Sequence, residues 1–191
     1  MRFREGKIIE RFSVEKNGTR HNLIIRFPKK SDAQAFQSFI NPIVVEHAFI
    51  GLQKKVSPKQ EKKFLSELLA ACKKGGTIAL VVETNGTVVT SCQIARDNAD
   101  ATRHVAHIGI AIAKDYRRLG LGTRLLRLLI EFGQSELHAE VITLSVYSGN
   151  KPAQRLYKKV GFVKIGVIPK GAKVAGKYYD NIIMVLRNDS P

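Results

Sequence analysis

Apolar and polar residues alternate along two pairs of short runs, and this pattern predicts two β-hairpins. Each pair flanks an Asn-Gly dipeptide, at Asn17 and at Asn85, which favours a tight hairpin turn. The four β-branched and aromatic runs cover residues 7–14 and 21–27, and residues 77–84 and 87–95. The first hairpin is expected to form an edge of the sheet.

Helical spacing of apolar residues predicts two helices between these hairpins. The first is capped by Ser31 or Asp32 and is expected to kink or break near Pro42, whose ring removes a donor and clashes with the preceding turn. The second follows a Ser-Pro-Lys-Gln capping box at residues 57–60 and stops at the glycine pair 75–76.

From residue 104 onward the pattern predicts a strand–helix–strand crossover, followed by a short helix and two more strands. The short helix begins at Pro152 and ends at Gly161. The basic, glycine-rich stretch 169–177 is expected to be a solvated hairpin loop, or alternatively a mobile substrate lid. The predicted strands are residues 104–112, 141–146, 162–168 and 178–186.

Length and composition agree with one domain of mixed α+β class over residues 1–191. The chain is 44% hydrophobic and 25% charged, which supports a real core and excludes disorder and collagen-like structure. The net charge of +16 adds an attraction to polyanions. That charge would attract a nucleic acid, an anionic membrane or a phosphate-rich cofactor.

From its cysteine content and the lengths of its apolar runs, the protein is expected to be cytoplasmic. Cys72 and Cys92 are too few for a disulfide framework and are not spaced as metal ligands, so both are expected in the core, and no metal is expected. No apolar run approaches the ~20 residues of a membrane span, and no apolar leader is present, so no membrane partner is expected.

Candidate chemistry is concentrated at residues 117–123, Arg-Arg-Leu-Gly-Leu-Gly-Thr, between an apolar strand and an amphipathic helix. Exposed N–H groups and the positive end of the helix dipole make an anion site at such a junction. A dinucleotide-binding loop would need Gly or Ala in place of Leu125, and the Gly-Lys-Ser/Thr of a P-loop is absent. The glycines therefore indicate either an ordinary tight turn or a phosphate loop of another type.

Residues 110–122 resemble motif A of the GNAT superfamily of N-acetyltransferases, whose Arg/Gln-x-x-Gly-x-Gly/Ala loop holds the pyrophosphate of acetyl-coenzyme A. Arg117, Gly120 and Gly122 fill the three defining positions. The chain is also similar to the second signature of the family, at Asn150, Ala153, Leu156, Tyr157, Gly161 and Phe162. Two motifs in the expected order make a chance match improbable.

The resemblance implies a central mixed, mostly antiparallel sheet flanked by helices, with a strand–helix–strand core that binds acetyl-coenzyme A. The resemblance covers about residues 77–187, the expected cofactor-binding core. Residues 29–76 would supply helices and the substrate-side wall, and residues 1–28 an additional hairpin with the first strand.

The resemblance further implies direct acetyl transfer to an amine in a ternary complex, with no covalent enzyme intermediate. Asn150 would anchor the pantetheine, Ala153 would line the same site, and Arg117 and Arg118 would add charge near the pyrophosphate. The pantetheine arm would pair with backbone groups of a splayed strand end, those of Ile110, Ala111 and Ile112. The pyrophosphate would take the backbone N–H groups of Arg118, Leu119, Gly120, Leu121, Gly122 and Thr123.

Following the family, the hydroxyl of Tyr157 would protonate the departing thiolate, a contribution of ~10²–10⁴-fold, or else it packs on the sheet and only shapes the pocket. The attacking amine must lose a proton, and His107 and Glu83 are the candidate bases. Each of these two residues could instead be an ordinary strand residue with no part in the reaction. Ser145 stands where relatives that acetylate protein N-termini often carry glutamate, so a protein N-terminus, a lysine and a small amine all stay open as acceptors.

A second hypothesis follows from the charge alone. The chain would then be a non-catalytic nucleic-acid or ribonucleoprotein-binding protein on an acetyltransferase scaffold. Lysine pairs support it, but paired lysines on helices are usually solvated, and no nucleic-acid-binding motif is recognisable. Polyanion binding is therefore expected to be secondary, and both a monomer and a homodimer are compatible with the sequence.

Overall fold

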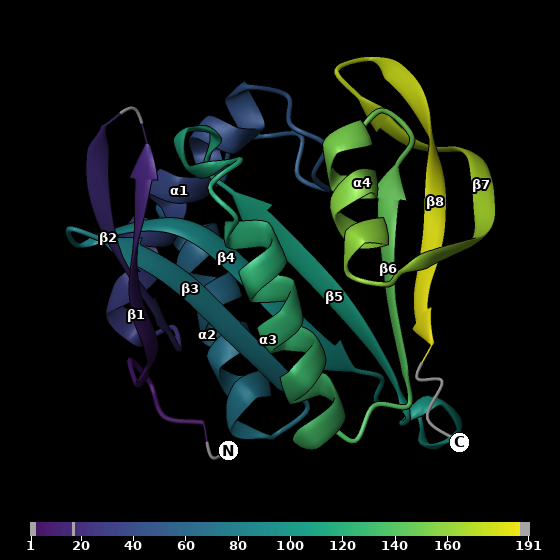
Figure 1. The fold of residues 1–191 in the computed structure, drawn as a ribbon, viewed down its shortest axis with the longest axis horizontal. Helices are drawn as coiled ribbons and strands as arrows, with labels where there is room; N and C mark the ends of the chain where they lie inside the picture. Colours follow the sequence, from purple (N-terminus) through teal and green to yellow (C-terminus); the bar gives the residue numbers. More distant parts are fainter. Residues whose placement is uncertain (1–2, 17, 188–191) are drawn as a thin grey trace.

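The computed structural model describes residues 3–16 and 18–187, which fold into one eight-stranded sheet and four α-helices (Figure 1). The strand order is β1-β2-β3-β4-β5-β6-β8-β7. The strands are β1 (Ile8–Lys16), β2 (Thr19–Arg26), β3 (Thr77–Thr84), β4 (Thr87–Arg96), β5 (Val105–Ile112), β6 (Val141–Tyr147), β7 (Val163–Val174) and β8 (Lys177–Arg187). The helices are α1 (Ala33–Val45), α2 (Pro58–Lys73), α3 (Leu121–Ser135) and α4 (Lys151–Lys159).

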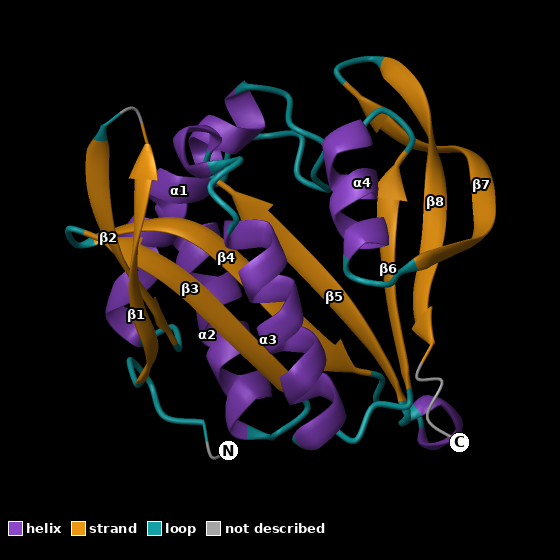
Figure 2. Ribbon diagram, viewed as in Figure 1, coloured by secondary structure: helices purple, strands orange, loops and turns teal. Residues whose placement is uncertain are grey.

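The sheet is mixed and mostly antiparallel, which confirms the predicted fold class. In the described residues only β5 and β6 pair in parallel, and α3 makes the crossover between them. Helices α1 and α2 cover one face of the sheet, and α3 and α4 cover the other (Figure 2). The two apolar cores lie on these two faces, and the larger one is built around the leucines of α3.

β1 is the added edge strand that the first hairpin predicts. β1 pairs along its length with β2, and β2 pairs in turn with β3. The predicted turn residue Asn17 lies outside the described residues.

Two predictions of local structure are wrong in part. The helix predicted to kink or break near Pro42 does not break there but continues to Val45; Pro42 removes only the single bond that its own N–H would have donated to the Ser38 carbonyl. The stretch 169–177, predicted as a solvated hairpin loop, is an exposed hairpin, but its loop is much shorter than predicted: β7 reaches Val174, β8 begins at Lys177, and the turn is Ala175-Gly176.

Both cysteines are buried free thiols, as expected. Burial raises the pKa of Cys72 to about 11 and the pKa of Cys92 to about 12. Because the thiolate is the reactive form, we expect neither thiol to react with Ellman's reagent in the folded protein near pH 8, and both to react in denaturant. Rapid labelling of the native protein would contradict this burial.

None of the helices in the described residues is both long enough and apolar enough to span a bilayer.

Candidate active site

β5 and β6 separate after three paired residues. Residues 105–107 pair with residues 141–143, and no further pairing between these strands occurs in the described part of the chain. β5 then continues to Ile112 beside β4, while β6 continues to Tyr147 beside β8. Two backbone edges that face each other are thus left unpaired at the upper end of the sheet in Figure 1.

The free edge of β5 presents the backbone groups of Ile110 and Ile112. The N–H of Ala113 donates to a carbonyl of β4, so by alternation Ala111 also faces β4, and Ile110 and Ile112 face the gap. The Ile112 carbonyl already accepts a hydrogen bond from Nε of Arg117 at 2.9 Å. Two of the three expected pantetheine partners therefore face the gap, and Ala111 does not.

The loop before α3 carries a row of unpaired donors. Arg118 has φ 65° and Gly120 has φ 78°, so both adopt the left-handed conformation that orients successive N–H groups into a concave anion site. Gly120 is the N-cap of α3 and provides no side-chain cap. Within the described residues, no acceptor meets the N–H groups of residues 118–123. These donors lie at the positive end of a helix dipole, and this arrangement fits a pyrophosphate.

Gly122 allows α3 and α4 to approach each other closely. A Cβ at this position would lie 2.6 Å from Cδ2 of Leu156 and 3.6 Å from Cδ1 of Ile112. Leu156 precedes Tyr157 on α4. The missing side chain therefore brings the second signature beside the phosphate loop and the end of β5.

Asn150 and Ala153 begin α4 together. Asn150 is the N-cap, and its side-chain oxygen accepts a hydrogen bond from the N–H of Ala153 at 3.2 Å. The Asn150 amide nitrogen has no partner within the described residues, so this nitrogen is the group left to bind a ligand.

Tyr157 is buried on the inner face of α4, with its ring edge-on to Phe162 at 6.2 Å between centroids. Its hydroxyl forms no hydrogen bond within residues 3–16 and 18–187. Burial raises the pKa of Tyr157 to about 12, because the apolar surroundings disfavour the phenolate. The hydroxyl is therefore a protonated donor without a protein partner.

Comparison with known proteins decides the family. A family model described as "Acetyltransferase (GNAT) family" matches residues 47–162, more than half of the chain. The chain belongs to the GNAT acetyltransferase family. It is 33% identical, over 109 residues, to the L-amino acid N-acetyltransferase AaaT of Escherichia coli, and the match spans 57% of this chain and 67% of that protein.

Solved GNAT structures agree with the fold. An acetyltransferase of the GNAT family from Streptococcus pneumoniae superposes with a TM-score of 0.75 at 29% identity, covering 85% of this chain and 98% of that one. A putative acetyltransferase, yncA, from Salmonella typhimurium, solved with its cofactor acetyl-CoA, gives a TM-score of 0.76 at 24% identity, covering 89% and 96%. The predicted family, enzyme class and acetyl-coenzyme A cosubstrate are confirmed.

His107 of this GNAT chain lies on the face of β5 opposite α3. Its Nδ1 is 2.6 Å from Oγ1 of Thr143, its Nε2 is 2.9 Å from Oδ1 of Asp97, and the side chain is 53% exposed. Ala111 lies on the same face four residues further on, about 13 Å at the usual strand rise. His107 therefore lies on the face of the sheet that α1 and α2 cover, and not beside the strand end.

Glu83 is held in an ion-pair cluster with Arg26 and Asp32. Arg26 donates to Glu83 from Nε at 2.7 Å and to both oxygens of Asp32 at 2.7 and 2.9 Å. Burial lowers the pKa of Arg26, but the hydrogen bonds to Asp32 and Glu83 raise it overall. Glu83 thus serves as a counter-ion for a buried arginine. No cluster of His, Cys, Asp or Glu suited to a metal ion is found within the described residues.

An ion pair that the sequence analysis missed joins the loop before α3 to the end of α1. Arg117 donates from Nη2 to the carboxylate of Glu46, which caps the C-terminus of α1. No local sequence pattern indicates this contact, because 71 residues separate the two partners. The Arg117 guanidinium therefore contacts Glu46 and the Ile112 carbonyl in this structure.

Replacing Glu46 with glutamine tests whether Arg117 also serves the pyrophosphate. If the guanidinium must release Glu46 to contact the cofactor, Glu46→Gln should tighten acetyl-coenzyme A binding about two- to fivefold, since a partly exposed pair is worth about 0.5–1 kcal/mol. Equilibrium dialysis measures the change. An unchanged or weakened affinity would show that Arg117 only braces α1 against β5.

The loop after α1 also crosses to α4, as Figure 1 shows. The Phe49 ring packs edge-on against Tyr179 of β8 at 5.0 Å between centroids. A Cβ on Gly149 would lie 2.4 Å from Cζ of Phe49, so the ring lies directly on the backbone ahead of Asn150. An aromatic pair thus joins the loop after α1 to β8 beside the start of α4.

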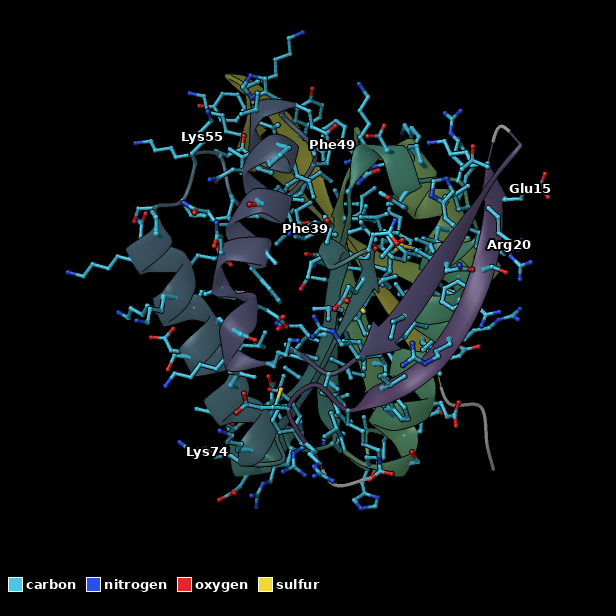
Figure 3. All side chains as sticks on the ribbon, turned by 90° about the vertical axis from the view of Figure 1, so that its left-hand side faces the viewer. Glu15, Arg20, Phe39, Phe49, Lys55 and Lys74 are labelled. Carbon is cyan, nitrogen blue, oxygen red and sulfur yellow. The ribbon has the colours of Figure 1, made fainter. Side chains whose placement is uncertain are left out.

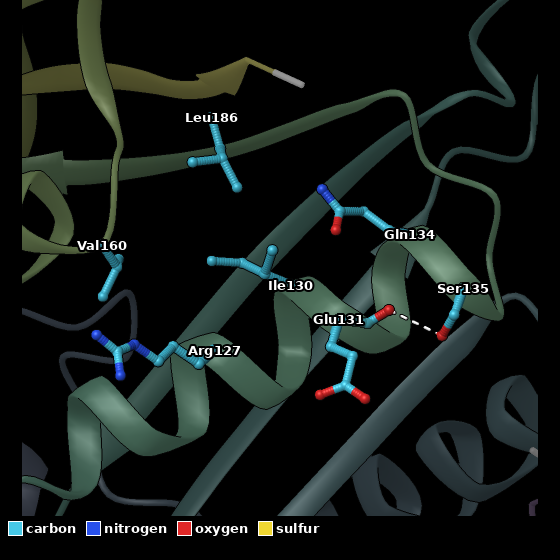
Figure 4. Close-up of a pocket in the computed structure, with 7 residues that line it drawn as sticks. All are labelled: Arg127, Ile130, Glu131, Gln134, Ser135, Val160 and Leu186. Carbon is cyan, nitrogen blue, oxygen red and sulfur yellow. Dashed lines mark hydrogen bonds between the residues drawn. The ribbon is translucent and has the colours of Figure 1, made fainter. Parts of the chain in front are cut away.

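An open groove of about 590 Å³ lies elsewhere, along the second half of α3 (Figure 4). It is lined by Arg127, Ile130, Glu131, Gln134, Ser135, Val160 and Leu186. None of these residues belongs to the phosphate loop or to the free edge of β5. The groove therefore does not mark the cofactor site.

Proposed function

We propose that this GNAT enzyme transfers the acetyl group of acetyl-coenzyme A to a primary amine by direct attack in a ternary complex. The observation that carries the proposal is the row of unpaired N–H groups at residues 118–123, placed at the end of a strand whose outer edge is also unpaired. The amine nitrogen attacks the thioester carbonyl, the C–S bond breaks, and the thiolate takes up a proton. The product amide nitrogen loses one proton to a base.

The backbone supplies most of the binding in this proposal. Donors of residues 118–123 hold the pyrophosphate, and Ile110 with the Ile112 N–H align the pantetheine arm as an added strand. The Asn150 amide nitrogen donates to the same arm. Binding through backbone groups positions the thioester without requiring particular side chains on β5.

Tyr157 is the proposed proton donor for the thiolate. Its unpartnered hydroxyl and raised pKa keep a proton available at neutral pH. A thiol ionises near ~8.5, so full transfer from a tyrosine of higher pKa is uphill, and hydrogen bonding to the developing thiolate contributes much of the effect. We therefore place its contribution at the lower end of the general-acid range, about 10²-fold.

His107 is the better of the two proposed bases. Glu83 is neutralised by Arg26. Both ring nitrogens of His107 are in contact, with Thr143 and Asp97, but the ring is exposed and can take up a proton through a chain of water if the Thr143 hydroxyl turns from donor to acceptor. Mutation to glutamine separates the two: His107→Gln should lower kcat and shift its pH profile, and Glu83→Gln should mainly lower the melting temperature. The reverse pattern would transfer the role of base to Glu83.

An amine panel tests the proposed reaction. The enzyme is incubated with acetyl-coenzyme A and free amino acids, peptides or polyamines, and release of the coenzyme A thiol is followed together with the mass gain of one acetyl group. A free amino acid is included because the E. coli relative is named for L-amino acids. Thiol release that depends on an amine supports the proposal, and its absence with every amine would overturn it.

We also propose that the enzyme is cytoplasmic and acts as a monomer or a homodimer.

A further inference from the structure

Two segments far apart in the sequence meet beside the start of α4, and both carry positive charge. The loop after α1 and the β7–β8 hairpin are joined by the contact between Phe49 and Tyr179. The start of α4 joins them, because Phe49 lies on Gly149. We name this surface the acceptor rim, defined by residues 46–57, 149–151 and 168–180.

The acceptor rim carries six exposed lysines, and none of them forms an ion pair within the described residues. They are Lys54, Lys55, Lys151, Lys170, Lys173 and Lys177. The rim has two carboxylates, and both are engaged: Glu46 accepts from Arg117, and Asp180 accepts from the backbone N–H of Lys170 at 3.0 Å. A backbone N–H carries no net charge, so Asp180 keeps its negative charge, and the rim presents six lysines against this one carboxylate, which has no cationic partner in the described part of the chain.

This charge restricts the class of acceptor amine. A free polyamine would approach a surface of its own sign, which lowers its association rate and its affinity. A nucleic acid matches the charge but offers no aliphatic amine to attack the thioester. A free amino acid carries a single carboxylate, and one lysine would be enough to pair with it. An acidic polypeptide matches both the sign and the extent of the rim and supplies an aliphatic amine.

Building on the proposed function, we infer that the acceptor amine belongs to an acidic polypeptide segment that docks along the lysines of the acceptor rim. The amine passes the Phe49–Tyr179 contact to reach the thioester, and the acidic side chains that flank it lie over the two lysine-bearing segments. Exposed pairs of this kind act mainly on association, so the effect belongs in kcat/KM and weakens with salt.

Peptides of equal length test the inference. Three peptides carry one acceptable amine each, flanked by acidic, neutral or basic residues, and kcat/KM is measured for each at low and at near-physiological salt, beside a free amino acid and spermidine. We expect the acidic peptide to be preferred over the basic one by at least tenfold, with the preference falling as salt rises.

Charge reversal then locates the docking surface. Lys55 lies at the same end of the molecule as Phe49, and Lys74 lies at the opposite end (Figure 3). Lys55→Glu and Lys74→Glu change the net charge equally. We expect Lys55→Glu to lower kcat/KM for the acidic peptide about fivefold and to leave the acetyl-coenzyme A affinity unchanged. Lys74→Glu should change neither value.

The outcomes separate the docking inference from the reaction itself. Acetylation of peptides or amino acids with no preference for acidic sequence, or equal effects of the two reversals, would overturn the docking while leaving the reaction intact. An RNA oligonucleotide that binds through Lys55 without any discrimination among the peptides would also overturn it. Failure of every amine would instead overturn the proposed function.

Discussion

Replacing Gly120 with valine should weaken acetyl-coenzyme A binding at least tenfold. Gly120 has φ 78°, and a β-branched residue there costs about 1–2 kcal/mol or more, so the loop turns away and its N–H groups no longer converge. The dissociation constant is measured by equilibrium dialysis, and the folded state is checked by the melting temperature.

The hairpin glycine Gly86 provides a matched control. Its φ is 77°, and a Cβ there, as at Gly120, would meet no atom within 4 Å. Gly86→Val therefore introduces similar backbone strain far along the chain from the phosphate loop. We expect a comparable loss of stability with an unchanged affinity for acetyl-coenzyme A. Equal affinities for the two variants would contradict an anion site at residues 118–123.

Removing the Tyr157 hydroxyl should lower kcat about 10²-fold and leave acetyl-coenzyme A affinity nearly unchanged. The hydroxyl has no hydrogen-bond partner within the described residues, so Tyr157→Phe strands no buried group and should change the free energy of unfolding by less than about 1 kcal/mol. The phenyl ring of the variant would keep the edge-on contact with Phe162. A kcat within twofold of the wild type would show that the ring only shapes the pocket.

The pH dependence of the wild type follows from the same burial. Because the pKa of Tyr157 is raised to about 12, the hydroxyl stays protonated, and kcat should show no fall from its ionisation below about pH 10. An unfolded tyrosine ionises near ~10, so burial penalises the phenolate, and Tyr157 destabilises the folded state only as the pH rises above that value. An alkaline fall in kcat near pH 9 that disappears in Tyr157→Phe would contradict the raised pKa.

Local signals predicted most of the strands and helices that surround the proposed cofactor site. The glycines of the phosphate loop, the Asn-Gly hairpins and the capping box each act through a few neighbouring residues. The capping box at Ser57 and the turn at Asn85 and Gly86 are such features, and the structure contains both. Their roles could be read from the sequence, because nothing distant decides them.

Long-range contacts decided the features that the sequence did not predict. Glu83 is neutralised by Arg26, 57 residues away, and Arg117 pairs with Glu46 across 71 residues. The packing of Phe49 on Gly149 joins segments a hundred residues apart. No periodicity records such pairings, since each requires the sheet order and the course of the loop after α1 to be known first.

The extension of β7 to Val174 and the start of β8 at Lys177, within residues 169–177, were not predicted, for a different reason. Glycine, proline and lysine in this stretch favour a loop, but pairing of β7 with β8 supplies backbone hydrogen bonds that override those local preferences. The ladder accommodates Pro169 and Gly171 at a register shift between Ile168 and Ala172, and Gly176 lies in the turn. Three lysines of the acceptor rim, Lys170, Lys173 and Lys177, are thereby held on the β7–β8 hairpin.

Isothermal titration of acetyl-coenzyme A into the wild-type protein at near-physiological salt tests the central claim most directly, because it requires no assumption about the acceptor. The unpaired donors of residues 118–123 predict saturable one-to-one binding that persists when an RNA oligonucleotide is added. Absence of binding, or heat that vanishes with salt or with RNA, would contradict a cofactor site at this loop and favour a protein that binds polyanions through charge alone.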